Sequence, residues 1–127
     1  MPRTPRTSAE RKRAERVGRR AEGFVALYLR LTGHSILARN YRCRSGEIDI
    51  IARRWRTIVF IEVKQRSRAA HAVEPVTARS ERRIMDASEV WMNTNPIHIG
   101  SATDIRYDIV TLVGWRVGHL KNAFRGW

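Results

Sequence analysis

The 127-residue sequence contains a single cysteine, Cys43, and no long hydrophobic run. One cysteine excludes an intramolecular disulfide framework, so we expect a reduced, partly buried thiol in a reducing compartment. No apolar stretch approaches the ~18 residues of a membrane span. The basic N-terminus is not followed by the ~7–15-residue apolar stretch of a secretory signal. These absences predict a cytoplasmic protein.

Acidic residues are scarce beside basic ones. The sequence has 12 Asp and Glu against 25 Lys and Arg, a formal net charge of +13. Such a charge favours a polyanionic partner, most simply nucleic acid, because binding releases counterions. An anionic membrane is the competing partner, but it would favour a basic amphipathic helix with Trp or Phe on its apolar face. The first predicted helix has Val, Leu, Ala and one Phe there, so nucleic acid is preferred and no membrane partner is expected.

The length and a hydrophobic content of 43% fit one globular domain with its own core. Residues 1–7, with two prolines, are expected to form a disordered basic arm, and residues 8–127 a single domain. An amphipathic helix is predicted from a capping box at Thr7 and Glu10 to a C-cap at Gly33. The later elements are a strand at 35–43, a hairpin at 46–53 and 57–64, a loop at 65–76, a helix at 77–93 and a strand or hairpin at 103–120. This α-β-β-β-α-β order, with room for one more short strand, predicts an α/β or α+β fold in which helices cover a mixed sheet.

Charged residues interrupt the most strand-like part of the sequence, the hairpin. Residues i and i+2 share a face of a strand, so Glu62 and Lys64 project together, as do Glu47 and Asp49. If the hairpin closes through a two-residue loop at Trp55–Arg56, Asp49 lies opposite Glu62. Their Cβ atoms would then be about 4.5–5.5 Å apart.

Two carboxylates at that distance repel each other, so either one is protonated or a cation lies between them. Carboxylate oxygens and water suit a hard divalent ion such as Mg²⁺. Lys64 could orient or activate a metal-bound water, or stabilise charge that develops on phosphorus. Glu22 lies at the edge of the apolar stripe of the first helix and would point toward the same sheet. This pattern predicts a metal site for phosphodiester hydrolysis.

The spacing D-x(12)-E-x-K, from Asp49 to Glu62-Val63-Lys64, resembles the PD-(D/E)xK nuclease signature. Ile48 stands where that signature has proline. A preceding helix that carries Glu22 resembles the archaeal Holliday-junction resolvase branch. The blocks "AEGFVALYLRLTGHSIL", "NYRCRSGEIDIIA", "VFIEVKQRS", "RYDIV" and "HLKNAF" together resemble the YraN family of small bacterial proteins, over roughly residues 17–125.

This resemblance implies a restriction-endonuclease-like fold and a metal-dependent endonuclease that uses Mg²⁺ or Mn²⁺. It implies that Asp49, Glu62, Glu22 and the Val63 carbonyl are metal ligands and that Lys64 is the catalytic lysine. DNA, including branched or single-stranded structures, is the expected substrate, and a homodimer is expected by analogy with small resolvases. The rival hypotheses are a nucleic-acid-binding protein that keeps the fold without cutting, and a small basic accessory of a ribosome or other assembly.

Several other basic and aromatic residues are candidate nucleic-acid contacts. Arg66 and Arg68 follow the lysine closely and suit phosphate groups. Arg19 and Arg20 belong to a basic helix face that either binds the nucleic-acid backbone or is simply solvated. Trp55, at the hairpin tip, either stacks on an unpaired base or stabilises the turn or a dimer contact.

The remaining charged residues have simpler interpretations. Glu47 is interpreted as a solvated or Arg-paired neighbour rather than a ligand. Gln65 faces the opposite side of its strand, where it either helps to place substrate or is packed or solvated at the end of the sheet. Arg106 and Asp108, two residues apart, are interpreted as a structural ion pair. The four histidines show no metal-ligand spacing and are assigned to no metal.

Overall fold

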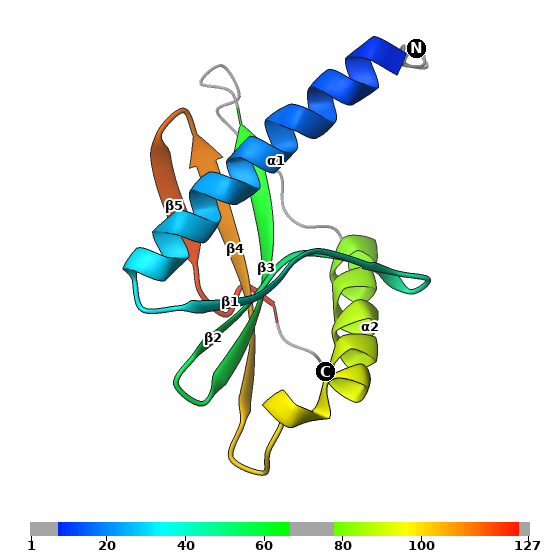
Figure 1. Ribbon diagram of the computed structural model, residues 1–127, viewed down its shortest axis with the longest axis vertical. Helices are drawn as coiled ribbons and strands as arrows, with labels where there is room; N and C mark the ends of the chain where they lie inside the picture. Colours follow the sequence, from blue (N-terminus) through cyan, green and yellow to red (C-terminus); the bar gives the residue numbers. More distant parts are fainter. Residues whose placement is uncertain (1–7, 67–77, 125–127) are drawn as a thin grey trace.

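A computed structural model describes residues 8–66 and 78–124 of the chain (Figure 1). Its elements are α1 (Ser8–Leu31), β1 (Ser35–Cys43), β2 (Gly46–Arg54), β3 (Thr57–Arg66), α2 (Ala78–Thr94), the short 3-10 helix η1 (Pro96–His98), β4 (Asp104–Val113) and β5 (Arg116–Leu120). The predicted α/β class and element order are confirmed, and β5 is the additional short strand. β3 runs two residues beyond its predicted end because Gln65 and Arg66 still pair with β4.

Some predictions lie outside the described residues. These are the basic arm at 1–7, Thr7 of the capping box, most of the loop at 65–76, and Arg68. The side chains of residues 9–19, which include Glu10 and Arg19, also lie outside the description. These features therefore stay predictions.

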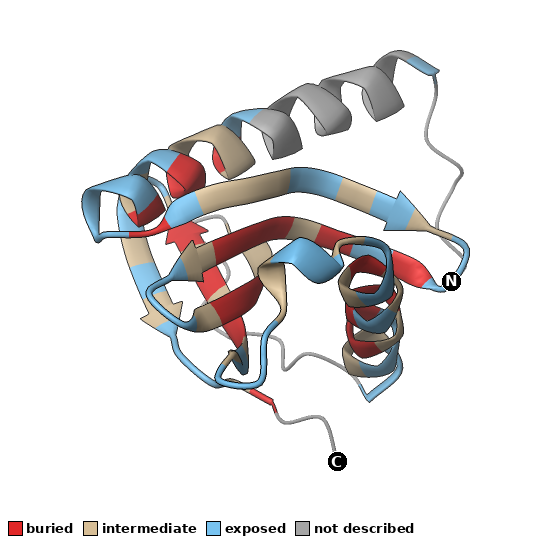
Figure 2. Ribbon diagram, turned by 60° about the horizontal axis from the view of Figure 1, so that its bottom comes forward, coloured by how far each residue is buried: buried red, intermediate tan, exposed pale blue. Residues whose placement is uncertain are grey.

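The five strands form one mixed sheet in the order β1-β2-β3-β4-β5. Only the β3–β4 pair, among the four pairs of this sheet, is parallel. A parallel neighbour requires a crossover, and the segment that contains α2 provides it. The middle of β3, Ile58–Ile61, is fully buried because helices cover both faces of the sheet, as Figures 1 and 2 show.

The two helices cover opposite faces of the sheet, and each face has its own apolar cluster. On the α1 face the cluster consists of Val25, Ala26, Leu29, Ile50, Ala52, Val59, Ile61 and Val110. On the α2 face it consists of Ile48, Ile51, Ile58, Phe60, Ile84, Met85, Ala87, Trp91, Tyr107 and Phe124. Each fully buried aliphatic side chain contributes about 1.5–3 kcal/mol to the free energy of folding. Neither described helix is both long and apolar enough to cross a membrane.

The β2–β3 hairpin has the predicted register. Arg54 pairs with Thr57 across the two-residue turn at Trp55–Arg56, and pairing continues to Ile50 and Ile61. Asp49 would come next opposite Glu62, but the ladder ends before them. Ile48 and Ile50, although two residues apart, lie in clusters on opposite faces, so the alternation of β2 breaks at Asp49. The acidic segment therefore lies where β2 leaves β3.

Gly46, the first residue of β2, touches the backbone of α2. A Cβ atom at this position would collide with the main-chain carbonyl of Arg83, and it would also crowd the Arg83 Cβ atom. The residue after it in the helix, Ile84, is buried in the core. The absence of a side chain at Gly46 therefore sets how closely α2 approaches the start of β2.

We predict that Gly46→Ala lowers the free energy of unfolding by about 1–3 kcal/mol, because the added methyl group forces α2 away from β2. Gly23→Ala is the matched control: its Cβ would have ordinary contact with Arg39, and alanine in a helix is favoured by about 0.5–1 kcal/mol over glycine. Urea denaturation of both variants measures the difference. Equal stability of Gly46→Ala and the wild type would contradict this close contact.

Candidate active site

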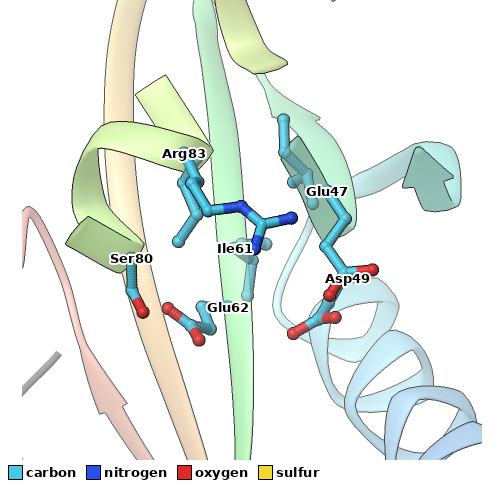
Figure 3. Close-up of a pocket in the computed structure, with 8 residues that line it drawn as sticks. Glu47, Asp49, Ile61, Glu62, Ser80 and Arg83 are labelled. Carbon is cyan, nitrogen blue, oxygen red and sulfur yellow. The ribbon is translucent and has the colours of Figure 1, made fainter. Parts of the chain in front are cut away.

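A cleft opens where β2 and β3 separate beside the first turns of α2 (Figure 3). Its walls are formed by Glu47, Ile48, Asp49, Ile61, Glu62, Ser80, Arg83 and Ile84. Three carboxylates thus meet at an apolar floor. The predicted grouping of acids from both arms of the hairpin is what the structure shows at this cleft.

Asp49 is held by a backbone donor of the neighbouring strand. The N–H of Val63 donates a 2.8 Å hydrogen bond to Asp49 Oδ2. Regular antiparallel pairing would use a backbone carbonyl at such a position, but the ladder has already ended at Ile50 and Ile61. The carboxylate replaces the missing carbonyl acceptor. The Val63 N–H therefore stays hydrogen-bonded although the two strands have separated.

Glu22 reaches the same point from α1. Its carboxyl group lies close enough to that of Asp49 for a hydrogen bond, which two carboxyl groups can form only when one of them carries a proton. Burial raises the pKa of Asp49 to about 7; the Val63 N–H opposes this rise, and the negative charges of Glu22, Glu62 and Glu47 add to it. The pKa of Glu22 is raised too, first by burial. Near neutral pH Asp49 is therefore partly protonated.

Glu62 and Lys64 form an ion pair on β3. Lys64 Nζ lies 2.8 Å from Glu62 Oε1, and the side chains are 27% and 16% exposed, respectively. The second oxygen, Glu62 Oε2, is buried and has no hydrogen-bond partner in the described part of the chain. A buried acceptor without a partner costs about 1–3 kcal/mol, so it requires an explanation.

The donor set suits a hard divalent cation. Carboxylates from Glu22, Asp49 and Glu62, together with the Val63 carbonyl, are the oxygen ligands that Mg²⁺ and Mn²⁺ prefer, and Glu62 Oε2 is an unused acceptor among them. Within residues 8–66 and 78–124, no three acidic, His or Cys side chains already enclose a common point. The residues therefore fit an ion by their chemistry, and a bound ion would compete with any proton held by Asp49 or Glu22.

Glu47 lines the cleft but is largely engaged elsewhere. It lies 3.5 Å from Arg42 Nε, and both side chains are mostly exposed. This matches its interpretation as an Arg-paired neighbour, and an exposed pair of this kind contributes at most about 1 kcal/mol. Gln65 is exposed at the end of β3, away from the cleft side chains.

The candidate nucleic-acid contacts are not all near the cleft. Arg66 follows Lys64 on the same side of β3 and is partly buried, and Arg20 is exposed on α1. Trp55 is 90% exposed at the hairpin tip, at the other end of β3 from Lys64. The two residues are nine positions apart, which corresponds to roughly 25–30 Å along an extended strand. The structure thus separates Trp55 from the acidic cleft, and the binding roles of all these residues stay predictions.

A second polar cluster lies on the α1 face and centres on Asp108, which is fully buried. Arg106 donates to both of its oxygens at 2.8 and 2.9 Å, His119 Nε2 donates at 2.7 Å, and the Asn122 N–H donates at 2.9 Å. The Tyr28 hydroxyl of α1 lies at hydrogen-bond distance, 3.0 Å, from His119 Nδ1. Burial alone would raise the pKa of Asp108, but these donors lower it below its usual range.

The predicted Arg106–Asp108 ion pair is confirmed, but the wider cluster was not predicted. His119 and Tyr28 are far from Asp108 in the sequence, and no spacing signal connects them. The cluster fastens α1 to β4 and β5, and α1 carries Glu22 six residues before Tyr28. Arg83 and Ser80 were also missed, because the helical periodicity of α2 marks only its apolar face.

Comparison with known proteins gives consistent results. The model of a family described as uncharacterised protein family UPF0102 matches residues 21–112. A UPF0102 protein of Mesorhizobium japonicum is 43% identical over 122 residues, which cover 95% of this chain and 96% of that protein. A UPF0102 protein of Agrobacterium fabrum is 42% identical over 118 residues, with coverage of 92% and 95%. The matched region contains all four acidic and lysine residues of the predicted site.

We predict that Asp49→Asn stabilises the protein above neutral pH in the presence of EDTA. The folded-state pKa of Asp49, about 7, exceeds its unfolded value of about 3.9, so the wild type loses stability as pH rises between these values. Asparagine keeps an acceptor for the Val63 N–H and removes the charge. The gain should be near zero at pH 4 or below and should rise to about 3–4 kcal/mol at pH 8, measured by denaturation.

Glu47→Gln is the control for this prediction, because its carboxylate is exposed and it should change stability little at either pH. A gain from Asp49→Asn that is the same at pH 5 and pH 8 would show that the buried charge is not its cause.

We predict that Asp108→Asn lowers the free energy of unfolding at pH 7 by about 2–4 kcal/mol, because Arg106 and His119 lose their charged partner. The folded-state pKa of Asp108 is lowered, so its contribution is present above the unfolded pKa and is lost as pH falls through the folded one. The difference from the wild type should therefore shrink in acid. Arg42→Gln, which breaks an exposed pair, should cost less than about 1 kcal/mol. If Asp108→Asn lowers the free energy of unfolding by the same amount at every pH, the packing of the side chain rather than its charge is the cause.

Proposed function

We propose that this chain, which belongs to the UPF0102 (YraN) family, is a metal-dependent nuclease. Its proposed reaction is the hydrolysis of phosphodiester bonds of DNA. The family is described as uncharacterised, so its match supplies no activity. The observation that carries the proposal is the meeting of Asp49, Glu62 and the Lys64 ammonium group beside one cleft.

Each of these side chains has a definable task. Asp49, Glu62, Glu22 and the Val63 carbonyl would hold Mg²⁺ or Mn²⁺, and the ion, when bound, supplies Lewis-acid polarisation of a phosphate oxygen. The Val63 N–H keeps the Asp49 carboxylate at the cleft. Lys64 is kept there by Glu62, where its ammonium group can donate to a phosphate oxygen or stabilise developing negative charge.

The charge of the whole chain supports a nucleic-acid substrate. A net charge of +13 attracts a polyanion, and counterion release adds to its affinity. Arg66 lies two residues beyond Lys64 on the same side of β3 and would add a positive charge next to the lysine. Branched or single-stranded DNA is the finer form of the proposal, and a homodimer would supply the two sites that a pair of cuts requires.

A non-catalytic nucleic-acid-binding protein is the rival. The state of Asp49 argues against it, because a carboxylate with a pKa of about 7 lowers the stability of the fold at neutral pH. A surface that only binds phosphates has no use for such a group. Costly, mutually repelling acids are typical of sites that bind a cation or perform chemistry.

The test is an assay of purified protein with labelled duplex, single-stranded, flapped and four-way DNA and with RNA, each with Mg²⁺ or Mn²⁺. We expect cleavage of at least one DNA, and a loss of about 100-fold or more in Lys64→Ala. Lys121→Ala is the matched control, since it removes the same charge from an exposed position outside the cleft. Cleavage that survives Lys64→Ala would assign the activity to another site or to a contaminant.

Divalent-ion titration by calorimetry provides the second measurement. Wild-type protein should bind Mn²⁺, and Asp49→Ala should bind it much more weakly because a carboxylate of the donor set is lost. No binding by the wild type, even with DNA present, would reject the catalytic proposal. Salt-sensitive DNA binding without cleavage would favour the rival.

A further inference from the structure

Arg83 is the basic residue of the cleft wall. Among the eight lining residues that the structure describes, the others are acidic, apolar or, in the case of Ser80, a hydroxyl. Figure 3 shows its guanidinium group directed from α2 into the space between Glu62 and the side of the cleft formed by Glu47 and Asp49. A positive group thus faces the carboxylates from the opposite wall.

The backbone of Arg83 is fixed while the end of its side chain is exposed. Its carbonyl lies against Gly46 so closely that β2 has no room for a Cβ atom there. Ile84, the next residue, is buried in the core on the same side of the sheet. The backbone that carries the guanidinium group is therefore held in place beside the cleft, while the residue as a whole is exposed to solvent.

No carboxylate of the described residues holds the guanidinium group of Arg83 in an ion pair, although three carboxylates line the same cleft. Each of those carboxylates has another partner: Arg42 for Glu47, Lys64 for Glu62, and the Val63 N–H with Glu22 for Asp49. The guanidinium group of Arg83 is therefore available to bind an anion from outside the protein.

We propose that Arg83 binds a phosphate group of the nucleic-acid strand that enters the cleft, and that it thereby positions this strand beside Asp49, Glu62 and Lys64. The inference rests on the proposed function for the identity of the ligand, a nucleic-acid phosphate. The planar guanidinium group presents paired N–H donors that match two oxygens of a phosphate. Lys64 from β3 and Arg83 from α2 then contact the strand from two sides of the cleft.

This role has opposite consequences for the two ligands of the cleft. The guanidinium group attracts a phosphate but repels a divalent cation bound to the carboxylates that it faces. Removal of its charge should therefore weaken DNA binding and strengthen cation binding in the absence of DNA. A side chain that only supports the fold of the cleft would weaken both.

The experiment compares Arg83→Gln with Arg82→Gln in the full chain. Arg82 is the matched control, because it is the neighbouring exposed arginine of α2 but does not line the cleft. Binding of a fluorescent DNA oligonucleotide is measured by anisotropy in EDTA over a range of salt concentrations, and Mn²⁺ binding by calorimetry without DNA. Thermal melting checks that both variants are folded.

We expect Arg83→Gln to weaken DNA binding at least about fivefold and to lower the magnitude of the log–log salt slope by about one. Its Mn²⁺ affinity should rise about two- to fivefold. Arg82→Gln should change both affinities less. Equal effects of the two variants on DNA binding, or weaker Mn²⁺ binding by Arg83→Gln, would overturn the inference.

These results separate the inference from the proposed function, because none of them depends on cleavage. If the protein binds DNA through Arg83 but cuts no substrate, the role of Arg83 is supported and the proposed nuclease activity is rejected. If the wild type binds DNA and Arg83→Gln weakens this binding no more than Arg82→Gln does, only the proposed role of Arg83 is rejected. A wild type that binds no DNA would overturn both.

Discussion

The hydrogen bond from the Val63 N–H to the Asp49 carboxylate is the interaction on which the cleft depends. It lets β2 separate from β3 after Ile50 and Ile61 without leaving a buried donor unpaired. A side chain that accepts this bond must be short and carry an acceptor oxygen, and it must come from β2 at the point where the alternation of its side chains breaks. The same bond holds a carboxylate near two others, and the repulsion among them is relieved only by protons, basic residues or a bound cation.

The two faces of the sheet contribute different parts to this arrangement. On one face, the Asp108 cluster joins α1 to β4 and β5 and so fixes the helix that carries Glu22. On the other face, the contact between Gly46 and the Arg83 backbone fixes α2. Neither helix could shift without changing the distance between its charged residue and Asp49. The central strand needs no polar support, because both of its faces are covered by apolar side chains.

Much of the fold followed from local signals. The two-residue turn at Trp55–Arg56 determined the hairpin register, and with it the approach of Asp49 to Glu62. Glu22 could be placed because a residue at the edge of an apolar stripe faces the sheet. His119 and Arg83 could not, because their positions depend on how β5 and α2 dock, and neither packing has a sequence period. The break of β2 at Asp49 was also hidden, since alternation was assumed throughout the strand.

The parallel pairing of β3 with β4 has a consequence for the order of folding. The β1–β2–β3 meander can form from its own short turns, whereas β4 joins it only after the chain has crossed over through α2. α1 packs on β2 and β3 through its apolar face, but its contact between Tyr28 and His119 forms only after β5 has joined the sheet. During synthesis from the N-terminus the acidic hairpin is therefore made early, and the polar contact that ties α1 to β5 is made late. A nascent chain would therefore hold Asp49 and Glu62 close together before the C-terminal contact that secures α1, and with it Glu22, has formed.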